Sequence, residues 1–89
     1  MIVSFRDKAT EDIFNGTASK IARKTCPQTI WRITVRKLDQ LDSVKSLEEL
    51  KIPPGNRKGF YIIRINKQFR ICFKWSQSGP DEVEITDYH

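Results

Sequence analysis

The chain has 89 residues, a net charge of +5 and a hydrophobic fraction of 38%. This length predicts one domain over residues 1–89 with a modest core, and the hydrophobic fraction excludes a wholly disordered chain. No apolar run reaches the roughly 18 residues of a membrane span and no signal-peptide pattern opens the chain, so we expect a cytoplasmic protein without a membrane partner.

The first part of the chain predicts a strand followed by a capped helix. Residues 2–6 show the alternation of a strand, with Val3 and Phe5 on one face. Asp7 is a suitable N-cap for a short helix that follows it directly. Gly16 then provides the C-terminal stop of that helix.

Helical patterns continue to about residue 42, with one interruption. A second helical stretch begins near Ala18 and meets Pro27, which breaks a helix interior but is favoured in a first turn. We therefore expect a break at Pro27 and a new helix from there, with apolar residues at helical spacing. Ser46 and Glu49 match a capping box, and Pro53-Pro54-Gly55 ends any helix that begins there.

The last third of the chain predicts three strands. Residues 60–65 and 69–75 are strand-like, whereas 76–81 predicts a turn and 82–86 a last strand. The order of strand, helices and three-strand meander predicts an α+β fold. We expect the helices to cover one face of an antiparallel sheet and the other face to be open to solvent or ligand.

The middle strand of this meander has the clearest alternation. Its core-facing residues are predicted to be Phe69, Ile71, Phe73 and Trp75. Its opposite face would present Arg70, Cys72 and Lys74, beside the outward-pointing Glu82, Glu84 and Thr86 of the last strand. Such a face is either a solvated surface with weak cross-strand Lys–Glu pairs or a ligand surface, and the alternation alone favours neither.

Two stretches of the chain carry cations and no acid. Residues 13–38 contain six cations, namely Lys20, Arg23, Lys24, Arg32, Arg36 and Lys37. Residues 50–80 contain seven, namely Lys51, Arg57, Lys58, Arg64, Lys67, Arg70 and Lys74. Because each neutralised phosphate releases condensed counterions, this clustering favours a nucleic-acid-binding surface over ordinary solubilising charge.

The cysteines and the single histidine predict neither a metal site nor a cofactor. Cys26 and Cys72 do not form a Cys-x-x-Cys pair, and one histidine gives zinc no second ligand of its type. We expect both cysteines to be structural and unpaired, as is usual in a reducing cytosol.

Three side chains with acid–base chemistry follow the last strand directly. Histidine suits proton transfer near neutral pH, and Asp87 or Tyr88 would orient His89 or share that role. Residue types alone nevertheless favour a frayed, idle terminus over a catalytic one. A nuclease built here would be metal-free and would need RNA, because DNA lacks the attacking 2′-hydroxyl.

Four segments together resemble the HigB branch of the RelE-type toxins, also known as plasmid maintenance killer proteins. They are Pro53-Pro54-Gly55-Asn56-Arg57, residues 59–65, Gln68-Phe69-Arg70-Ile71-Cys72-Phe73 and Glu84-Ile85-Thr86-Asp87-Tyr88-His89. The resemblance covers almost the whole chain and implies a small α+β fold of the microbial ribonuclease type. It also implies metal-independent cleavage of messenger RNA on the ribosome, which inhibits translation. The implied partner is a helix-turn-helix antitoxin of the HigA type, through which alone the toxin would reach operator DNA.

Carried over by position, the resemblance makes Arg70 the contact to the scissile phosphate. It makes Asp87, Tyr88 and His89 the terminal acid–base and orienting group. To these we add Arg64 and Lys74 as RNA-binding residues from the sheet-face pattern. Many relatives have a longer segment before the first meander strand, with a lysine that this chain lacks. Its loss would remove one contributor to phosphate stabilisation, for which we expect the substitutes Lys51, Arg57 or Lys58.

Two other classes of function remain open at this point. One is a non-catalytic toxin such as the sister ParE-type gyrase inhibitors, which resemble this fold; a catalytically weakened toxin is a related case. The terminal Asp87-Tyr88-His89 argues against a pure inhibitor, because a binder needs no acid–base group. The other class is a plain RNA-binding module, which would show salt-dependent RNA affinity without cleavage.

Overall fold

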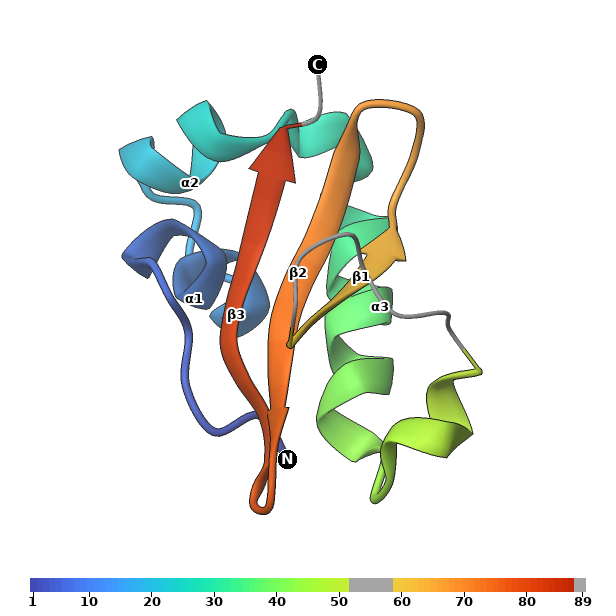
Figure 1. The fold of residues 1–89 in the computed structure, drawn as a ribbon. Coiled ribbons are helices and arrows are strands. Elements are labelled where there is room, and N and C mark those ends of the chain that lie inside the picture. Colours follow the sequence, from blue (N-terminus) through green and yellow to red (C-terminus); the bar gives the residue numbers. More distant parts are fainter. Residues whose placement is uncertain (52–58, 88–89) are drawn as a thin grey trace.

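The computed structural model describes residues 1–51 and 59–87. In chain order the elements are α1 (Lys8–Asn15), α2 (Lys20–Thr25), the 3-10 turn η1 (Gln28–Ile30), α3 (Trp31–Ser43), the 3-10 turn η2 (Leu47–Leu50), β1 (Phe60–Arg64), β2 (Phe69–Ser76) and β3 (Gly79–Asp87). The strands form one antiparallel sheet in the order β1-β2-β3, with the helices on one side of it (Figure 1). This arrangement confirms the predicted α+β fold.

The ends of α1 follow from single residues that the sequence analysis identified. The Asp7 side chain accepts a hydrogen bond from the backbone N–H of Thr10 at 2.9 Å, which satisfies one of the free donors at the helix start. Gly16 ends the helix with φ of 79°, a left-handed conformation that glycine adopts without steric cost. Both predicted ends are therefore confirmed.

The predicted interruption at Pro27 is also confirmed. α2 ends at Thr25, and η1 separates it from α3, which begins at Trp31 rather than at the proline. The Trp31 indole Nε1 donates to the carbonyl oxygen of Cys26 at 2.9 Å and so ties the two helices together across the break. In η2 the predicted capping box is present, since the Glu49 carboxylate accepts from the backbone N–H of Ser46 at 3.1 Å. The Pro53-Pro54-Gly55 stop lies outside the described residues.

The turn predicted over residues 76–81 is wrong, because β3 begins three residues earlier than expected. β2 and β3 are joined by only Gln77 and Ser78. Gly79 makes this possible: its φ is +124°, and a Cβ there would lie 2.6 Å from the backbone oxygen of Met1. The carbonyl of Pro80 accepts a hydrogen bond from the N–H of Val3, so the backbone groups of Pro80 point to the outer edge of β3. Proline is tolerated there because it has no N–H, and an N–H at this position would not bond to β2.

The strand predicted over residues 2–6 forms only one parallel bridge, between Phe5 and Val83 on the outer edge of β3. The ladder is interrupted because Glu82 adopts a left-handed φ of 49°, and its N–H is taken by the Ser4 hydroxyl at 3.0 Å. Val3 is 49% exposed whereas Phe5 is half-buried, so these two side chains do not share a buried face.

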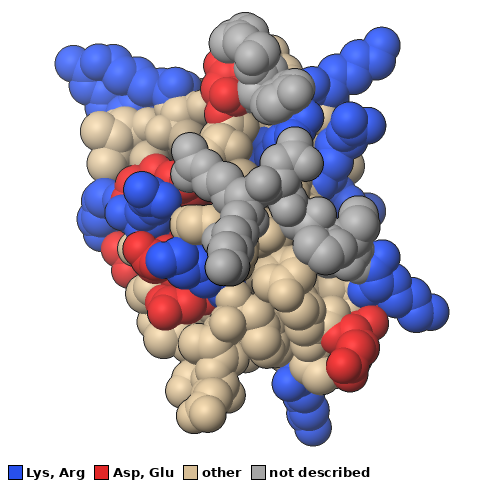
Figure 2. All heavy atoms as spheres, viewed as in Figure 1, with Lys and Arg blue, Asp and Glu red and all other residues tan. Residues whose placement is uncertain are grey.

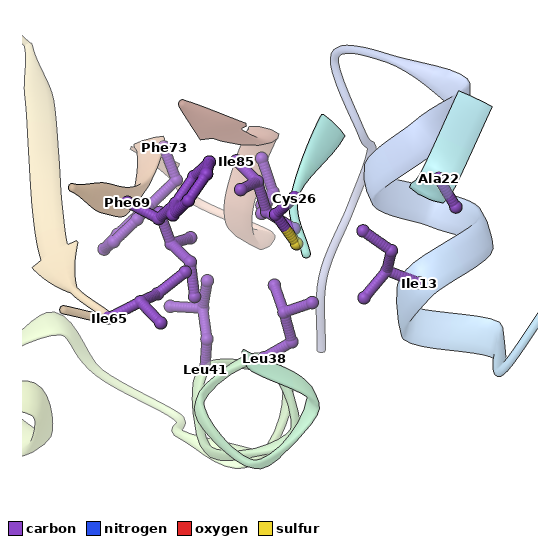
Figure 3. Close-up of a cluster of buried hydrophobic side chains, with 11 residues drawn as sticks. Ile13, Ala22, Cys26, Leu38, Leu41, Ile65, Phe69, Phe73 and Ile85 are labelled. Atoms are coloured by element: carbon purple, nitrogen blue, oxygen red, sulfur yellow. The ribbon is translucent and has the colours of Figure 1, made fainter. Parts of the chain in front are cut away.

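The core lies between the sheet and the helices. The alternate residues Phe69, Ile71 and Phe73 of β2 are buried, as predicted, and Trp75 is half-buried. Figure 3 shows Phe69 and Phe73 of β2 above the α3 side chains of Leu38 and Leu41, with Ile13 of α1 beside them. Within the described residues, no buried side-chain nitrogen or oxygen lacks a hydrogen-bond partner.

A buried carboxylate joins α1 to α2 and makes the stability of the fold depend on pH. The Ser19 hydroxyl donates to Asp12 Oδ2 at 2.7 Å, and Lys8 Nζ lies 3.3 Å from Oδ1. Ser19 first, and then Lys8, hold the pKa of Asp12 below its ordinary value although burial opposes them.

We expect the free energy of unfolding to fall with acidification and Asp12→Asn to reduce that fall. The unfolded chain takes up the Asp12 proton near pH 4, whereas the folded chain takes it up at lower pH. The contribution of the Asp12 carboxylate to the free energy of unfolding is thus fully present above about pH 4. It is lost as the pH decreases through the folded pKa. Urea unfolding between about pH 7 and 2.5 measures this. Parallel curves for the variant and the unaltered chain would contradict it.

Candidate nucleic-acid interface

The face of the sheet that points away from the helices has three cross-strand rows, which we call the open face. The first row is Arg64, Arg70 and Thr86; the second is Ile62, Cys72 and Glu84; the third is Phe60, Lys74 and Asp81. Residues directly opposite each other in antiparallel strands share a face, so each row projects together. No described helix covers this side of the sheet (Figure 1).

Arg70 occupies the centre of the first row. It lies on the middle strand, is half-buried, and stands opposite Arg64 of β1 on one side and Thr86 of β3 on the other. Arg64 is exposed. The planar guanidinium fork matches the geometry of phosphate oxygens, so two arginines opposite each other on adjacent strands suit a phosphate ligand. Figure 2 shows cationic side chains gathered over the end of the sheet where the β1–β2 connection lies.

Lys74 lies at the other end of the open face and has an acidic partner. Its Nζ is 2.8 Å from Glu82 Oε2 and 5.1 Å from the centroid of the Phe60 ring. Glu84 in the middle row is 3.6 Å from Arg6. The cross-strand Lys–Glu pair that the sequence analysis considered therefore exists. This part of the face is close to neutral, and the cationic character is concentrated in the Arg64–Arg70 row.

Asp87 lies at the same end of the sheet as Arg70 but on its other side. It stands opposite Phe69, whose side chain points into the core, so strand alternation directs Asp87 toward the helix layer. Its Oδ2 accepts from Gln68 Nε2 at 3.1 Å. The structure thus places Arg64, Arg70 and Thr86 in one cross-strand row, and the register places Asp87 in the next pair, opposite Phe69.

The remaining predicted site residues are placed less directly. Lys51 is exposed at the end of η2, where it adopts a left-handed φ of 52°. Arg57, Lys58, Tyr88 and His89 lie outside the described residues.

Thr86 is a polar neighbour of Arg70 that the sequence analysis did not propose as a site residue, because its position opposite Arg70 depends on the register of two strands. Its Oγ1 is 3.5 Å from Cys72 Sγ.

Both cysteines are free, and their surroundings differ. Cys26 is buried in the core, and burial raises the pKa of its thiol. Cys72 is half-buried on the open face. In the part of the chain that the structure describes, no group of three His, Cys, Asp or Glu side chains could hold a metal ion. No helix in that part is long and apolar enough to span a membrane.

The fold and its open face define a class of small α+β protein, in which helices back a meander and an arginine row occupies the side that no described helix covers. Residues 3–89 match the family of HigB-like toxins, described as the RelE-like toxin of the type II toxin–antitoxin system HigB. The chain is 35% identical to Toxin HigB-1 of Vibrio cholerae serotype O1, over 99% of this chain and 94% of that protein. It is 29% identical to an uncharacterized protein of Haemophilus influenzae, over 81% of this chain and 74% of that one.

The chain therefore belongs to the HigB-like family of RelE-like toxins, and it is a toxin of a type II toxin–antitoxin system. Membership in such a system gives it a cognate antitoxin as partner. The alignment with the Vibrio cholerae toxin extends over 96 positions, more than the 89 residues of this chain. This chain consequently lacks some residues that the relative has.

Proposed function

We propose that this toxin is a metal-independent endoribonuclease that cuts messenger RNA on the ribosome and so inhibits translation, acting as one domain over residues 1–89. The observation that carries the proposal is the Arg64–Arg70–Thr86 row, with Arg70 half-buried at the centre of an open sheet face. A partly desolvated arginine on a rigid central strand is a strong and well-oriented donor for a phosphate oxygen. Membership in the RelE-like toxins supports the same activity.

The chemistry needs no metal if the chain supplies charge and proton transfer. The 2′-oxygen of the ribose attacks the adjacent phosphorus, the bond from phosphorus to the 5′-oxygen breaks, and a 2′,3′-cyclic phosphate remains. The 2′-hydroxyl proton goes to a general base, and a general acid protonates the departing 5′-oxygen. We assign charge stabilisation to Arg70, and the acid–base and orienting roles to the terminal group Asp87, Tyr88 and His89. Within this group we assign Asp87 the orienting role, because strand alternation directs it toward the helix layer.

We further propose that the antitoxin is a helix-turn-helix protein of the HigA type. It would neutralise the toxin and repress their common operon, so that the toxin reaches operator DNA only through it. A target on translating ribosomes places the action of the toxin in the cytoplasm. A helix-turn-helix reading frame beside the gene would support this assignment.

Mapping transcript 5′ ends in cells that express the toxin tests the proposed activity. We expect new ends at positions phased with codons, because the ribosome presents messenger RNA one codon at a time. Cuts without codon phase would contradict ribosome dependence. Growth arrest with intact transcripts would contradict the nuclease and favour a non-catalytic toxin of the ParE type. RNA affinity without cuts or arrest would instead indicate an RNA-binding module.

A further inference from the structure

The outer edge of β3 is held by partners far away in the sequence. Outward-facing backbone groups on this edge belong to Val83, Ile85 and Asp87, because alternate residues of a strand point their N–H and C=O to the same side. The N–H of Val83 donates to the Ser4 carbonyl at 3.0 Å, and the Val83 carbonyl accepts from Arg6 at 2.9 Å. The bridge at Phe5 lies between these two bonds. Beyond Val83 the N-terminal segment no longer pairs with β3.

The next outward donor on this edge is taken by a side chain. The N–H of Ile85 donates to Thr10 Oγ1 at 3.0 Å, and the two residues are 75 positions apart. Thr10 is 0% exposed and lies in the first turns of α1, where its own N–H donates to the Asp7 cap. One buried hydroxyl thus joins a capped, rigid helix to the strand immediately before Thr86 and Asp87.

We propose that Thr10 is a positioning residue for cleavage, which fixes the C-terminal end of β3 relative to Arg70. This inference rests on the proposed nuclease function. Arg70 stands opposite Thr86 only in the observed register of β2 and β3. That ladder contains an irregularity between Cys72 and Lys74, and the bond from Ile85 to Thr10 attaches the part of β3 that lies beyond it. The proposed acid–base group continues directly from this end.

The chain offers a matched control for this proposal. Thr34 in α3 is likewise 0% exposed, and its Oγ1 makes one hydrogen bond, to the Ile30 carbonyl at 2.8 Å. Replacing either threonine by valine keeps the shape and removes one hydrogen bond, which is buried at Thr10 and part-buried at Thr34. Only Thr10 contacts β3 through that bond. At a temperature where both variants are folded, a purely structural role predicts an unaltered cleavage rate for both.

The experiment is single-turnover cleavage of messenger RNA bound to ribosomes, with toxin in excess and at a temperature where all variants are folded. Thr10→Val is expected to lower the maximal rate about tenfold to a hundredfold, since a misplacement of about 1 Å can cost ~10²-fold. The toxin concentration that gives half the maximal rate should stay unchanged. Thr10→Ser, which keeps the hydroxyl, should restore the rate, and Thr34→Val should leave it unaltered.

The proposal is overturned if Thr10→Val and Thr34→Val have the same rate, or if Thr10→Val changes only the half-saturating concentration. If the unaltered chain does not cleave, the proposed function fails on its own. Hydrogen exchange still tests the positioning in that case. Thr10→Val should speed exchange at the amides of Ile85 and Asp87 but not at Ile71 of the central strand. An equal change in exchange rate at all three amides would refute the positioning role.

Discussion

Arg70→Ala should abolish growth arrest and lower the rate of messenger RNA cleavage by about 10²-fold or more, while the chain stays folded. Arg70 is the central residue of the Arg64–Arg70–Thr86 row and lies on the middle strand of the sheet. A group that stabilises charge on the reacting phosphate acts mainly in the transition state, so the maximal rate should fall more than the affinity for programmed ribosomes. Cleavage assays together with ribosome binding measure the two effects.

Three further variants separate this role from bulk charge. Arg32→Ala removes the same charge from the exposed side of α3, behind the sheet, and should leave cleavage within about threefold. Asp87→Ala and His89→Ala should each relieve growth arrest if the terminal group carries the proton transfers. Undiminished toxicity in Arg70→Ala, Asp87→Ala and His89→Ala alike would remove the catalytic assignment. An equal loss in Arg70→Ala and Arg32→Ala would reduce Arg70 to one cation among many.

Phe73→Ala should destabilise the fold by about 3–5 kcal/mol, the usual cost of removing a fully buried aromatic side chain. Phe73 is 0% exposed at the centre of β2, and its ring stacks on Tyr61 of β1 with centroids 5.8 Å apart. Small domains are stable by about 5–15 kcal/mol, so the variant would lose a large part of its stability. Urea unfolding monitored by circular dichroism measures the change.

Phe60→Ala is the matched control for this experiment. Phe60 carries the same side chain, but it is half-buried on the open face beneath Lys74. Its removal should cost only about 1 kcal/mol. If the two variants were equally destabilised, the Phe60 end of the open face would be packed as tightly as the core.

The lysine that the resemblance predicts to be missing before β1 bears on the cations that the proposed cleavage would use. A chain without that lysine would depend more heavily on Arg70 and Arg64 for the proposed transition-state stabilisation. Their direct opposition in the sheet suits that dependence, because two arginines can hold different oxygens of one phosphate.

Much of the local structure was predictable because it depends on neighbouring residues. Asp7 and Gly16 cap α1, Pro27 separates α2 from α3, and Glu49 completes a capping box, all through contacts within one or two turns. The buried face of β2 was equally predictable, since strand alternation is a property of the backbone. The family resemblance, which the comparisons confirm, pointed to Arg70 as the phosphate contact, and that role stays a prediction.

Only the tertiary structure decided the contacts between residues that are distant in the sequence. The start of β3 at Gly79 depends on the close approach of Met1, and the reduction of the N-terminal strand to one bridge depends on the conformation of Glu82. The sequence by itself determined both ends of α1, the break between α2 and α3, and the buried face of β2, because each depends on neighbouring residues. It could not determine that Thr86, rather than Glu84, stands directly opposite Arg70, because a shift of two residues in strand register would keep the same face outward and change the pairing. That register is set by the packed core and by bonds such as that from Ile85 to Thr10, which form only when the chain is folded.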